Sequence, residues 1–318
     1  MKAREIESKL KDKFGKNSVA EVGFALYRLQ VLQRYRRFRG RNLLRRYGQF
    51  VRVKVLEATF ELDLHSWYQM DLFVGFDGGR LYEPGTMCLM RRLLKEGDTF
   101  MDIGASIGYF TVLGGIKVGP RGLVLAFEPS PTSFERLLRN CQINNLRNVR
   151  ASQCAIGGRD GHSYLYLSKE ESSSTMLGPT AEARTPVIVP VTRLEKAMQV
   201  ESVDLVKIDV EGYEMQVLPS LKQLAFSNPN MMLICEYNSS VYERTQSSPH
   251  VLFDRLHDIW PHIYEILEDQ LPRPVRGPLT DAMQISRRTC NLLCVPDSQL
   301  QFLEEVVSTS PSSESSVS

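Results

Sequence analysis

The stretch FMDIGASIGYFT, Phe100 to Thr111, decides the fold of this chain. Apolar residues lead to a carboxylate at Asp102, and two glycines, Gly104 and Gly108, follow with Ser106 midway between them. This order is typical of a buried strand that passes through a tight turn into a helix. In open α/β sheets, ligands bind at such turns, beyond the carboxyl ends of the strands. The stretch therefore predicts a ligand site and raises the question of which ligand prefers an aspartate and a serine there.

Strand and helix signals alternate along the rest of the chain, which predicts an α/β fold with a largely parallel sheet. We expect core strands over residues 99–105, 123–128, 149–156, 203–210, 231–237, 263–267 and 291–295. We expect helices over residues 109–118, 132–145, 213–226 and 249–259. Thr132 or Ser133 should cap the second of these helices. The alternating segments 162–168 and 186–194 predict a hairpin-like excursion from the sheet, joined by a Ser/Thr-rich loop.

The composition is that of an ordinary globular protein, with 318 residues of which 42% are hydrophobic and 24% charged. No apolar run approaches the roughly 20 residues of a membrane-spanning helix. The opening MKAREIESKL is charged and lacks the apolar segment of a signal peptide, and the six cysteines form no C-x-x-C pair. These features predict a cytoplasmic protein with reduced cysteines.

Charge is distributed unevenly, because residues 1–50 hold 14 Lys and Arg against 4 Asp and Glu while the whole chain has a net charge of +2. Within this segment, RLQVLQRYRRFRGRNLLRRYG suits a helix with one apolar face, interrupted near Gly40. Two interpretations stay open: a solvated helix packed on the domain, or peripheral docking to an anionic membrane or an anionic substrate. No nucleic-acid partner is expected, because no aromatic platform accompanies the arginines.

Phosphate ligands suit the glycine turn poorly. A dinucleotide site needs G-x-G-x-x-G with a bare middle glycine, but Ser106 stands there, and the Asp102 carboxylate would repel a pyrophosphate. S-adenosylmethionine carries an ammonium, a sulfonium and no phosphate, so Asp102 can receive its amino-acid end. Glu128, 20 residues beyond Gly108 at the end of the next strand, is placed to bind the ribose hydroxyls, as an acidic residue does for NAD. In a purely structural interpretation, Asp102 only caps the helix and Glu128 only makes a surface ion pair.

An ordered set of motifs makes the chain resemble the FkbM family of class I methyltransferases from about Val53 to Val295. These motifs are GRLYEPGT, GDTFMDIGASIGYFT, GLVLAFEPSPTSFERLLRN, CAIGG, VDLVKIDVEGYE and LLCV. The resemblance implies a Rossmann-like three-layer sandwich around a seven-stranded, mostly parallel sheet whose last strand is antiparallel. It also implies S-adenosylmethionine as methyl donor, S-adenosylhomocysteine as product, and O-methylation of a hydroxyl on a small metabolite, sugar or glycan precursor.

The resemblance also implies which residues contact the cofactor. These are Tyr82, Glu83, Asp102, Gly104, Ala105, Ser106, Gly108, Tyr109, Glu128, Cys154, Ala155 and Asp209. The chain departs from the family at Ser106, where the family commonly has Asn in D-x-G-A-N-x-G. Serine keeps a hydrogen-bonding oxygen but has a shorter reach, so one cofactor contact is expected to differ.

The motif VDLVKIDVEGYE places ionisable residues at the end of an apolar strand, where burial is costly without a task. Side chains alternate along a strand, so Lys207, Asp209 and Glu211 should share one face. The fourth strand neighbours the first in a doubly wound sheet, which would bring Asp209 near Asp102, where the transferable methyl should lie. We expect Asp209 beside the sulfonium or the acceptor, and Glu211 facing the acceptor. The alternative is an ion pair of Lys207 with either carboxylate that only joins strands.

A neutral hydroxyl must lose a proton during the transfer, and the candidate catalytic bases are Asp209, Glu211 and Glu83. No metal site is predicted. Mg²⁺ held by Asp209, Glu211 and Glu236 is a weaker interpretation, because hard carboxylates suit this ion but their spacing in the sequence does not show that they converge. A methyltransferase-like binding protein without catalysis and, less favoured, an NAD-dependent oxidoreductase stay open as alternatives.

The chain is expected to divide into four parts. These are a basic helical arm over 1–50, a lead-in segment over 51–98 that contributes to the pocket, the methyltransferase core over 99–297, and a Ser-rich tail over 298–318 whose end is disordered.

Overall fold

The computed structural model describes residues 40–168, 174–179, 183–198, 200, 202–238, 249–268, 271–275 and 289–308. The chain divides into two compact units. One contains residues up to Val51 together with Asp63–His65, and the other contains Arg52–Leu62 and the chain from Ser66 onward. No helix in these described ranges has the length and apolarity needed to cross a membrane.

In the first unit, residues 40–47 are helical, and the backbone N–H of Leu64 donates to the Gln49 carbonyl at 2.8 Å. Residues 1–39, which carry most of the basic arm, lie outside the described residues, as do residues 309–318 of the tail. The amphipathic helix of the arm and the disorder of the tail therefore stay predictions.

The second unit is built around a sheet of eight strands in the order β12-β11-β13-β10-β9-β3-β4-β5. Its strands are β3 (Thr99–Ile103), β4 (Leu123–Phe127), β5 (Val149–Ser152), β9 (Leu205–Ile208), β10 (Met232–Asn238), β11 (His262–Ile266), β12 (Arg273–Pro274) and β13 (Thr289–Val295). The pairs from β10 through β5 are parallel, whereas β13 is antiparallel to both β10 and β11. Apart from the two-residue edge strand β12, this is the expected seven-stranded sheet with its last strand antiparallel, so the predicted fold class is confirmed.

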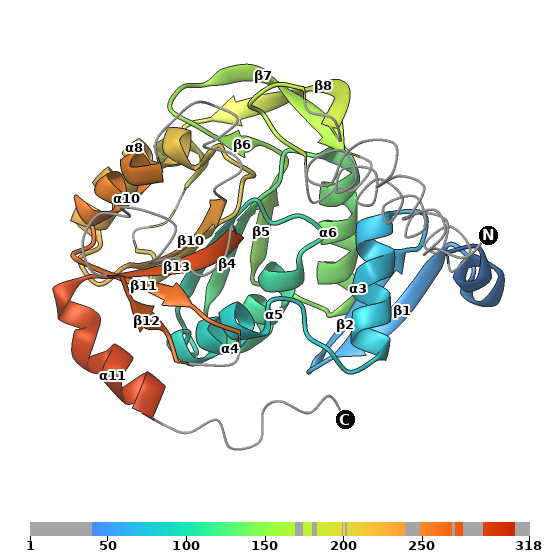
Figure 1. The fold of residues 1–318 in the computed structure, drawn as a ribbon, viewed down its shortest axis with the longest axis horizontal. Helices are drawn as coiled ribbons and strands as arrows, with labels where there is room; N and C mark the ends of the chain where they lie inside the picture. Colours follow the sequence, from blue (N-terminus) through green and yellow to red (C-terminus); the bar gives the residue numbers. More distant parts are fainter. Residues whose placement is uncertain are drawn as a thin grey trace, which may run out of the picture. The chain divides into compact units, whose positions relative to one another are not determined.

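Helices cover both faces of this sheet and complete the three layers. They are α3 (Trp67–Asp77), α4 (Pro84–Leu93), α5 (Tyr109–Val118), α6 (Pro131–Ile143), α7 (Leu194–Ala197), α8 (Glu214–Ser227), α10 (Pro249–His257) and α11 (Leu300–Ser308), with a 3₁₀ turn η2 (Asp297–Gln299). Figure 1 shows α4, α5 and α6 on one face and α8 and α10 on the other. Helix α11 forms from residues that were expected to belong to the Ser-rich tail.

Because successive side chains of a strand point to opposite faces of the sheet, the two faces carry different residues. Asp102 on β3 and Lys207 on β9 are register partners and point to the α5 face. Met101, Ile103 and Val206 point the other way, into the hydrophobic core that includes residues of α8 and α10. The α5 face of the sheet therefore contains buried charged residues, while the α8 face is apolar.

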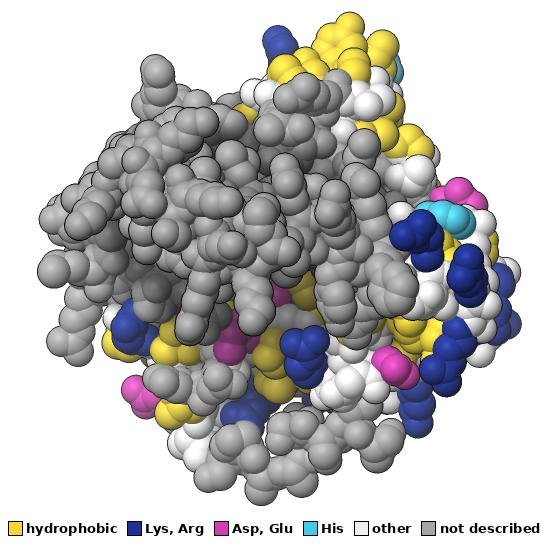
Figure 2. Space-filling view, turned by 45° about the vertical axis from the view of Figure 1, so that its right-hand side comes forward, with side chains coloured by type: hydrophobic (Ala, Val, Ile, Leu, Met, Phe, Trp, Pro, Cys, Tyr) yellow, Lys and Arg dark blue, Asp and Glu magenta, His cyan; other side chains and the backbone are white. Residues whose placement is uncertain are grey.

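The chain also forms two smaller sheets: β1 (Phe50–Val55) with β2 (Ala58–Asp63), and β6 (Ala155–Ile156) with β8 (Ala183–Thr192) and β7 (Gly161–Ser168). The antiparallel pairing of β7 and β8 confirms the predicted hairpin. Tyr164 and Ile188 are cross-strand partners and are 55% and 66% exposed, whereas Leu165 is buried. Figure 2 shows hydrophobic side chains gathered at the top of the view, the end at which Figure 1 labels β7 and β8.

Two expected elements differ in detail. The strand expected over 149–156 is divided between two sheets, because the Cys154 N–H closes a turn on the Ser152 carbonyl at 3.0 Å. Helix α6 is capped by Ser130, whose Oγ accepts the Ser133 backbone N–H at 3.5 Å, and not by Thr132 or Ser133. Pro131 explains the difference, since proline suits the first helical position and leaves the residue before it as the cap.

Candidate functional site

The turn between β3 and α5 requires both of its glycines. Gly104 and Gly108 have φ values of +86° and +88°, a region that L side chains rarely adopt. A Cβ on Gly104 would collide with the Asp209 backbone carbonyl, and one on Gly108 would collide with Leu137. The glycines therefore allow the turn to pack directly against the end of β9 and against α6.

Glu128 follows β4 and ties this turn to the next one. Its two carboxylate oxygens accept the backbone N–H groups of Ser106 at 2.8 Å and Ser130 at 2.7 Å. Burial raises the pKa of Glu128 to about 7, although these backbone hydrogen bonds act to lower it. Only 7% of Glu128 is exposed, so it does not make the surface ion pair that a purely structural interpretation expects.

A cavity of about 840 Å³, including its open mouth, lies beyond the carboxyl ends of β3, β4 and β9. Eight of the predicted site residues line it: Tyr82, Gly104, Ser106, Glu128, Cys154, Ala155, Asp209 and Glu211. Further lining residues were not singled out as site residues from the sequence: Tyr68, Ile103, Phe127, Pro129, Ser133, Ile156, Leu165, Ser174, Met176, Val210 and Tyr213.

Asp102 does not line this cavity, so its contact with the amino-acid end of a cofactor, directly or through water, stays a prediction. It is 1% exposed, and its Oδ2 accepts the Thr111 hydroxyl at 2.6 Å. Burial raises the pKa of Asp102, while the Lys207 charge lowers it. Asp102 is not a helix cap either, because α5 has Gly108 at its N-cap and no side-chain cap bond. Asp102 is a buried carboxylate that accepts a hydrogen bond from α5.

Glu83 does not line the cavity either, so its roles as a base and as a cofactor contact stay predictions. It occupies the N-cap position of α4 with φ of +42°, and its Oε2 accepts the Asn291 Nδ2–H at 2.8 Å. Burial raises the pKa of its carboxyl group. Tyr109, Ala105 and Gly108 lie outside the cavity lining as well, and the Tyr109 ring stacks on Phe76. These residues support the cavity wall.

Lys207 is the buried cation of the site. It is 1% exposed, its Nζ lies 2.8 Å from Asp209 Oδ2, and it stands 4.5 Å over the centre of the Phe110 ring. Burial disfavours the charged form, but Asp209, Glu83 and Asp102 together hold the pKa of Lys207 above its usual value. The predicted ion pair between Lys207 and Asp209 is therefore present, although Asp209 also faces the cavity.

The chain turns sharply after β9, so Glu211 does not continue the strand face of Lys207 as expected. Strand β9 ends at Ile208, and Glu211 and Gly212 have φ values of +52° and +100°. Glu214 holds this turn, since its Oε1 accepts the backbone N–H groups of Val210 at 3.3 Å and Gly212 at 3.1 Å. Burial raises the pKa of Glu214 to about 7.

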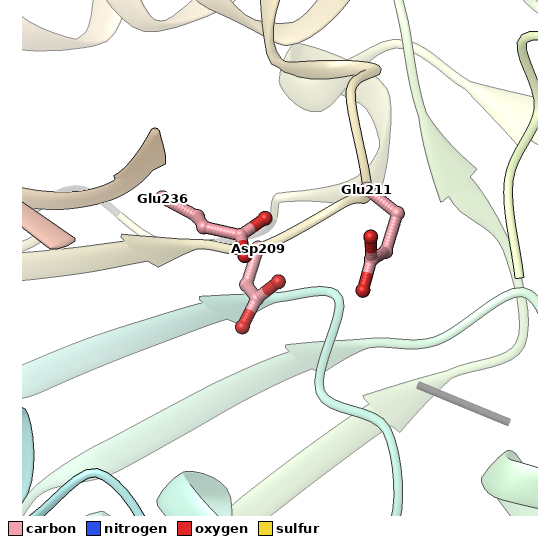
Figure 3. Close-up of side chains that lie close together, drawn as sticks. All are labelled: Asp209, Glu211 and Glu236. Carbon is pink, nitrogen blue, oxygen red and sulfur yellow. The ribbon is translucent and has the colours of Figure 1, made fainter. Parts of the chain in front are cut away.

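The turn brings Glu211 to the same place as Asp209 and Glu236, and we call these three residues the carboxylate cluster. One oxygen of each lies within 4.8 Å of the others (Figure 3). Burial, with the charges of Asp209 and Glu211, raises the pKa of Glu236 well above its usual value. Glu236 lines the cavity from β10, where a lone carboxylate in the run MMLICEY was a usable sequence signal. Tyr68 on α3 gave no such signal.

The departure at Ser106 has a backbone consequence that can be tested. Ser106 has φ of +49°, and this left-handed region costs an ordinary L-residue roughly 1–2 kcal/mol but is visited more readily by Asn. We expect Ser106→Asn to raise the free energy of unfolding by up to about 1 kcal/mol, measured by urea denaturation. Ser106→Ala is the matched control and should lower it. Equal destabilisation by both variants would contradict this account.

Comparison with known proteins shows the family to which the chain belongs. The Methyltransferase FkbM domain family matches residues 102–270. Methyltransferase 1 of Beauveria bassiana is 33% identical over 147 residues, which are 39% of this chain and 59% of that protein. Methyltransferase sdnD of Sordaria araneosa is 30% identical over 163 residues, or 41% of this chain and 62% of that protein. The 31-O-demethyl-FK506 methyltransferase FkbM of Streptomyces tacrolimicus is 30% identical over 95 residues, covering 30% of this chain and 36% of that protein. The chain thus spans about six tenths of the length of the first two relatives.

Proposed function

Because the chain belongs to the FkbM methyltransferase family, we propose that it transfers a methyl group from S-adenosylmethionine to a hydroxyl oxygen of a small metabolite, sugar or glycan precursor. The observation that carries this proposal is the cavity beyond β3 and β4, where Gly104, Ser106 and Glu128 meet the carboxylate cluster. The Streptomyces relative is a 31-O-demethyl-FK506 methyltransferase, and this name supports an oxygen acceptor.

The residues of the cavity suit this donor. Glu128 offers a buried carboxylate to ribose hydroxyls, and Phe127, Ile156 and Leu165 offer apolar surface to a purine. Gly104 has no side chain, so a ligand can approach the backbone closely. Among the described residues of this site, none forms the Gly-rich phosphate cradle that a dinucleotide needs, which weakens the NAD alternative.

In the proposed reaction, the acceptor oxygen attacks the methyl carbon and the C–S bond breaks with its electron pair left on sulfur. The hydroxyl proton passes to a carboxylate of the cluster. Asp209 and Glu211 both line the cavity and are the candidate bases, whereas Glu83 does not line it. The chain's main contribution is to align donor and acceptor and to exclude water.

Ligand-dependent thermal stabilisation tests the proposal, because a ligand that binds the native state raises the melting temperature. S-adenosylmethionine and S-adenosylhomocysteine should stabilise the full chain and NAD should not. A product-detected screen of hydroxylated acceptors should then yield a methyl ether. Stabilisation by NAD alone would overturn the proposal, and cofactor binding without any methylated product would favour the binding-protein alternative.

Glu128→Gln should weaken S-adenosylhomocysteine binding about tenfold or more, since a charge-assisted hydrogen bond contributes about 1.5–3 kcal/mol. The pKa of Glu128 near 7 adds a pH signature. The carboxylate becomes protonated as the pH falls from about 8 to about 6, so wild-type affinity should fall over this range more than that of the variant. Isothermal titration calorimetry of both proteins measures this, and comparing them removes the titration of the ligand itself. Unchanged affinity in Glu128→Gln would exclude Glu128 from the cofactor site.

A further inference from the structure

The backbone itself makes the carboxylate cluster converge. Asp209 follows β9 directly, Glu211 is in the turn after it, and Glu236 is on β10, which pairs in parallel with β9. Neighbouring strands that end at the same edge of a sheet bring these three residues together, and Figure 3 shows their carboxylates grouped at this edge. An oxygen from each residue lies within 4.8 Å of the other two, close enough for one small ion to contact all three.

One oxygen of this cluster has no partner. Glu236 Oε2 is buried and accepts no hydrogen bond from any residue that the structure describes. A buried carboxylate oxygen left without a partner is unfavourable, because the lost contacts with water are not replaced. This atom therefore points to a bound group.

The local charge indicates the kind of group. Lys207 is the cation seen to contact the cluster in the described part of the chain, and it donates to Asp209 Oδ2 at 2.8 Å. With all three carboxylates ionised, the cluster and this ammonium would carry a formal charge of −2, which one divalent cation would balance. Carboxylate oxygens are the ligands that Mg²⁺ and Mn²⁺ prefer.

We propose that Asp209, Glu211 and Glu236 form a binding site for a divalent cation of the Mg²⁺ or Mn²⁺ class. Three protein ligands leave positions in an octahedral shell for water or an acceptor oxygen. The role of the ion rests on the proposed function: a hydroxyl acceptor that enters an open position would lose its proton more readily beside the cation. The sequence spacing did not show convergence, and the paired ends of β9 and β10 supply it.

Direct binding of Mn²⁺ to the full chain, freed of metal with a chelator and dialysed, tests the site. Electron paramagnetic resonance of free Mn²⁺ and calorimetry should show one saturable site per chain. Glu236→Gln and Glu211→Gln should each weaken binding about tenfold or more, because each removes one charged ligand. Glu135→Gln, a change at an exposed carboxylate on α6 outside the cavity, is the matched control and should bind as wild type does.

S-adenosylhomocysteine binding, measured in the same samples, shows whether each variant is folded and separates this inference from the proposed function. Cofactor binding without saturable Mn²⁺ binding, or equal Mn²⁺ affinity in wild type and in the folded cluster variants, would overturn the cation site alone. Mn²⁺ binding that is weakened by the cluster variants in a protein without cofactor affinity would support the cation site and overturn the proposed function. If Glu236→Gln fails to fold, Glu211→Gln carries the test.

Discussion

Asp209→Asn is expected to lower kcat about 100-fold or more, the scale of a positioned acid–base group, while changing the Kd for S-adenosylhomocysteine only a few-fold. Asp209 lines the cavity at the end of β9, and the substitution keeps its size and leaves an amide oxygen that can accept the hydrogen bond that Lys207 donates to Oδ2 in the wild type. What it removes is one negative charge beside the acceptor. Glu128 contacts a different part of the cavity wall, so the cofactor should still bind.

Transfer of tritiated methyl to the acceptor found by the product screen gives kcat, and calorimetry gives the Kd. Glu135→Gln serves again as the control, since a charge change at an exposed residue outside the cavity lining should leave both constants unaltered. If Asp209→Asn keeps the wild-type kcat, the base is Glu211, and Asp209 only holds Lys207. A large loss of cofactor affinity would instead place Asp209 in the cofactor contacts.

The positions of the core strands could be predicted from the sequence because each strand carries its own local signal, whereas the antiparallel direction of the last strand was implied by the resemblance to a family. Two glycines at positions of positive φ mark the first turn, and Glu128 ends the next apolar run. The helix and strand bounds came out within a few residues for the same reason. Val149–Ser152 and Ala155–Ile156 form separate strands, because a turn of two residues leaves no trace in an apolar pattern.

The site was less predictable, since its geometry depends on contacts between distant segments. Asp102 and Glu83 carry the right chemistry but are held behind the cavity wall by Thr111 and by Asn291, which is 208 residues further along the chain than Glu83. Glu211 reaches the cluster only because the chain leaves the strand at Ile208. The alternation of side chains along a strand therefore pointed to Glu211, but Glu211 reaches the cluster through a turn and not along the strand.

The resemblance to a family supplied residue types and order, and the structure supplied distances. Glu236 shows the difference: the sequence places it 25 residues after Glu211, and only the pairing of β9 with β10 brings both to one point. The same pairing pattern puts Lys207 between Asp102 on one strand and Asp209 at the edge of the cavity. Burial of a cation at this place links the stability of the fold to the charge of the site.

Lys207→Met should lower the free energy of unfolding by about 3–5 kcal/mol at neutral pH, because removing one partner of a buried ion pair leaves the others uncompensated. Lys207 is 1% exposed and is the cation that lowers the pKa of the buried carboxyl groups of Asp102 and Glu83. Methionine fills a similar volume, so the loss measures the charge and not a cavity. Urea denaturation followed by circular dichroism gives the difference.

The pH dependence distinguishes charge from packing. Burial raises the pKa of both Asp102 and Glu83, so these groups take up a proton at a higher pH than exposed carboxylates do, and a protonated carboxyl group no longer needs the cation. The difference in stability between wild type and Lys207→Met should therefore shrink as the pH falls. Adding Asp102→Asn to Lys207→Met should recover part of the loss at neutral pH, because it removes one of the buried charges left without a partner. A deficit that is constant with pH and is deepened by Asp102→Asn would mean that Lys207 stabilises the sheet through packing alone.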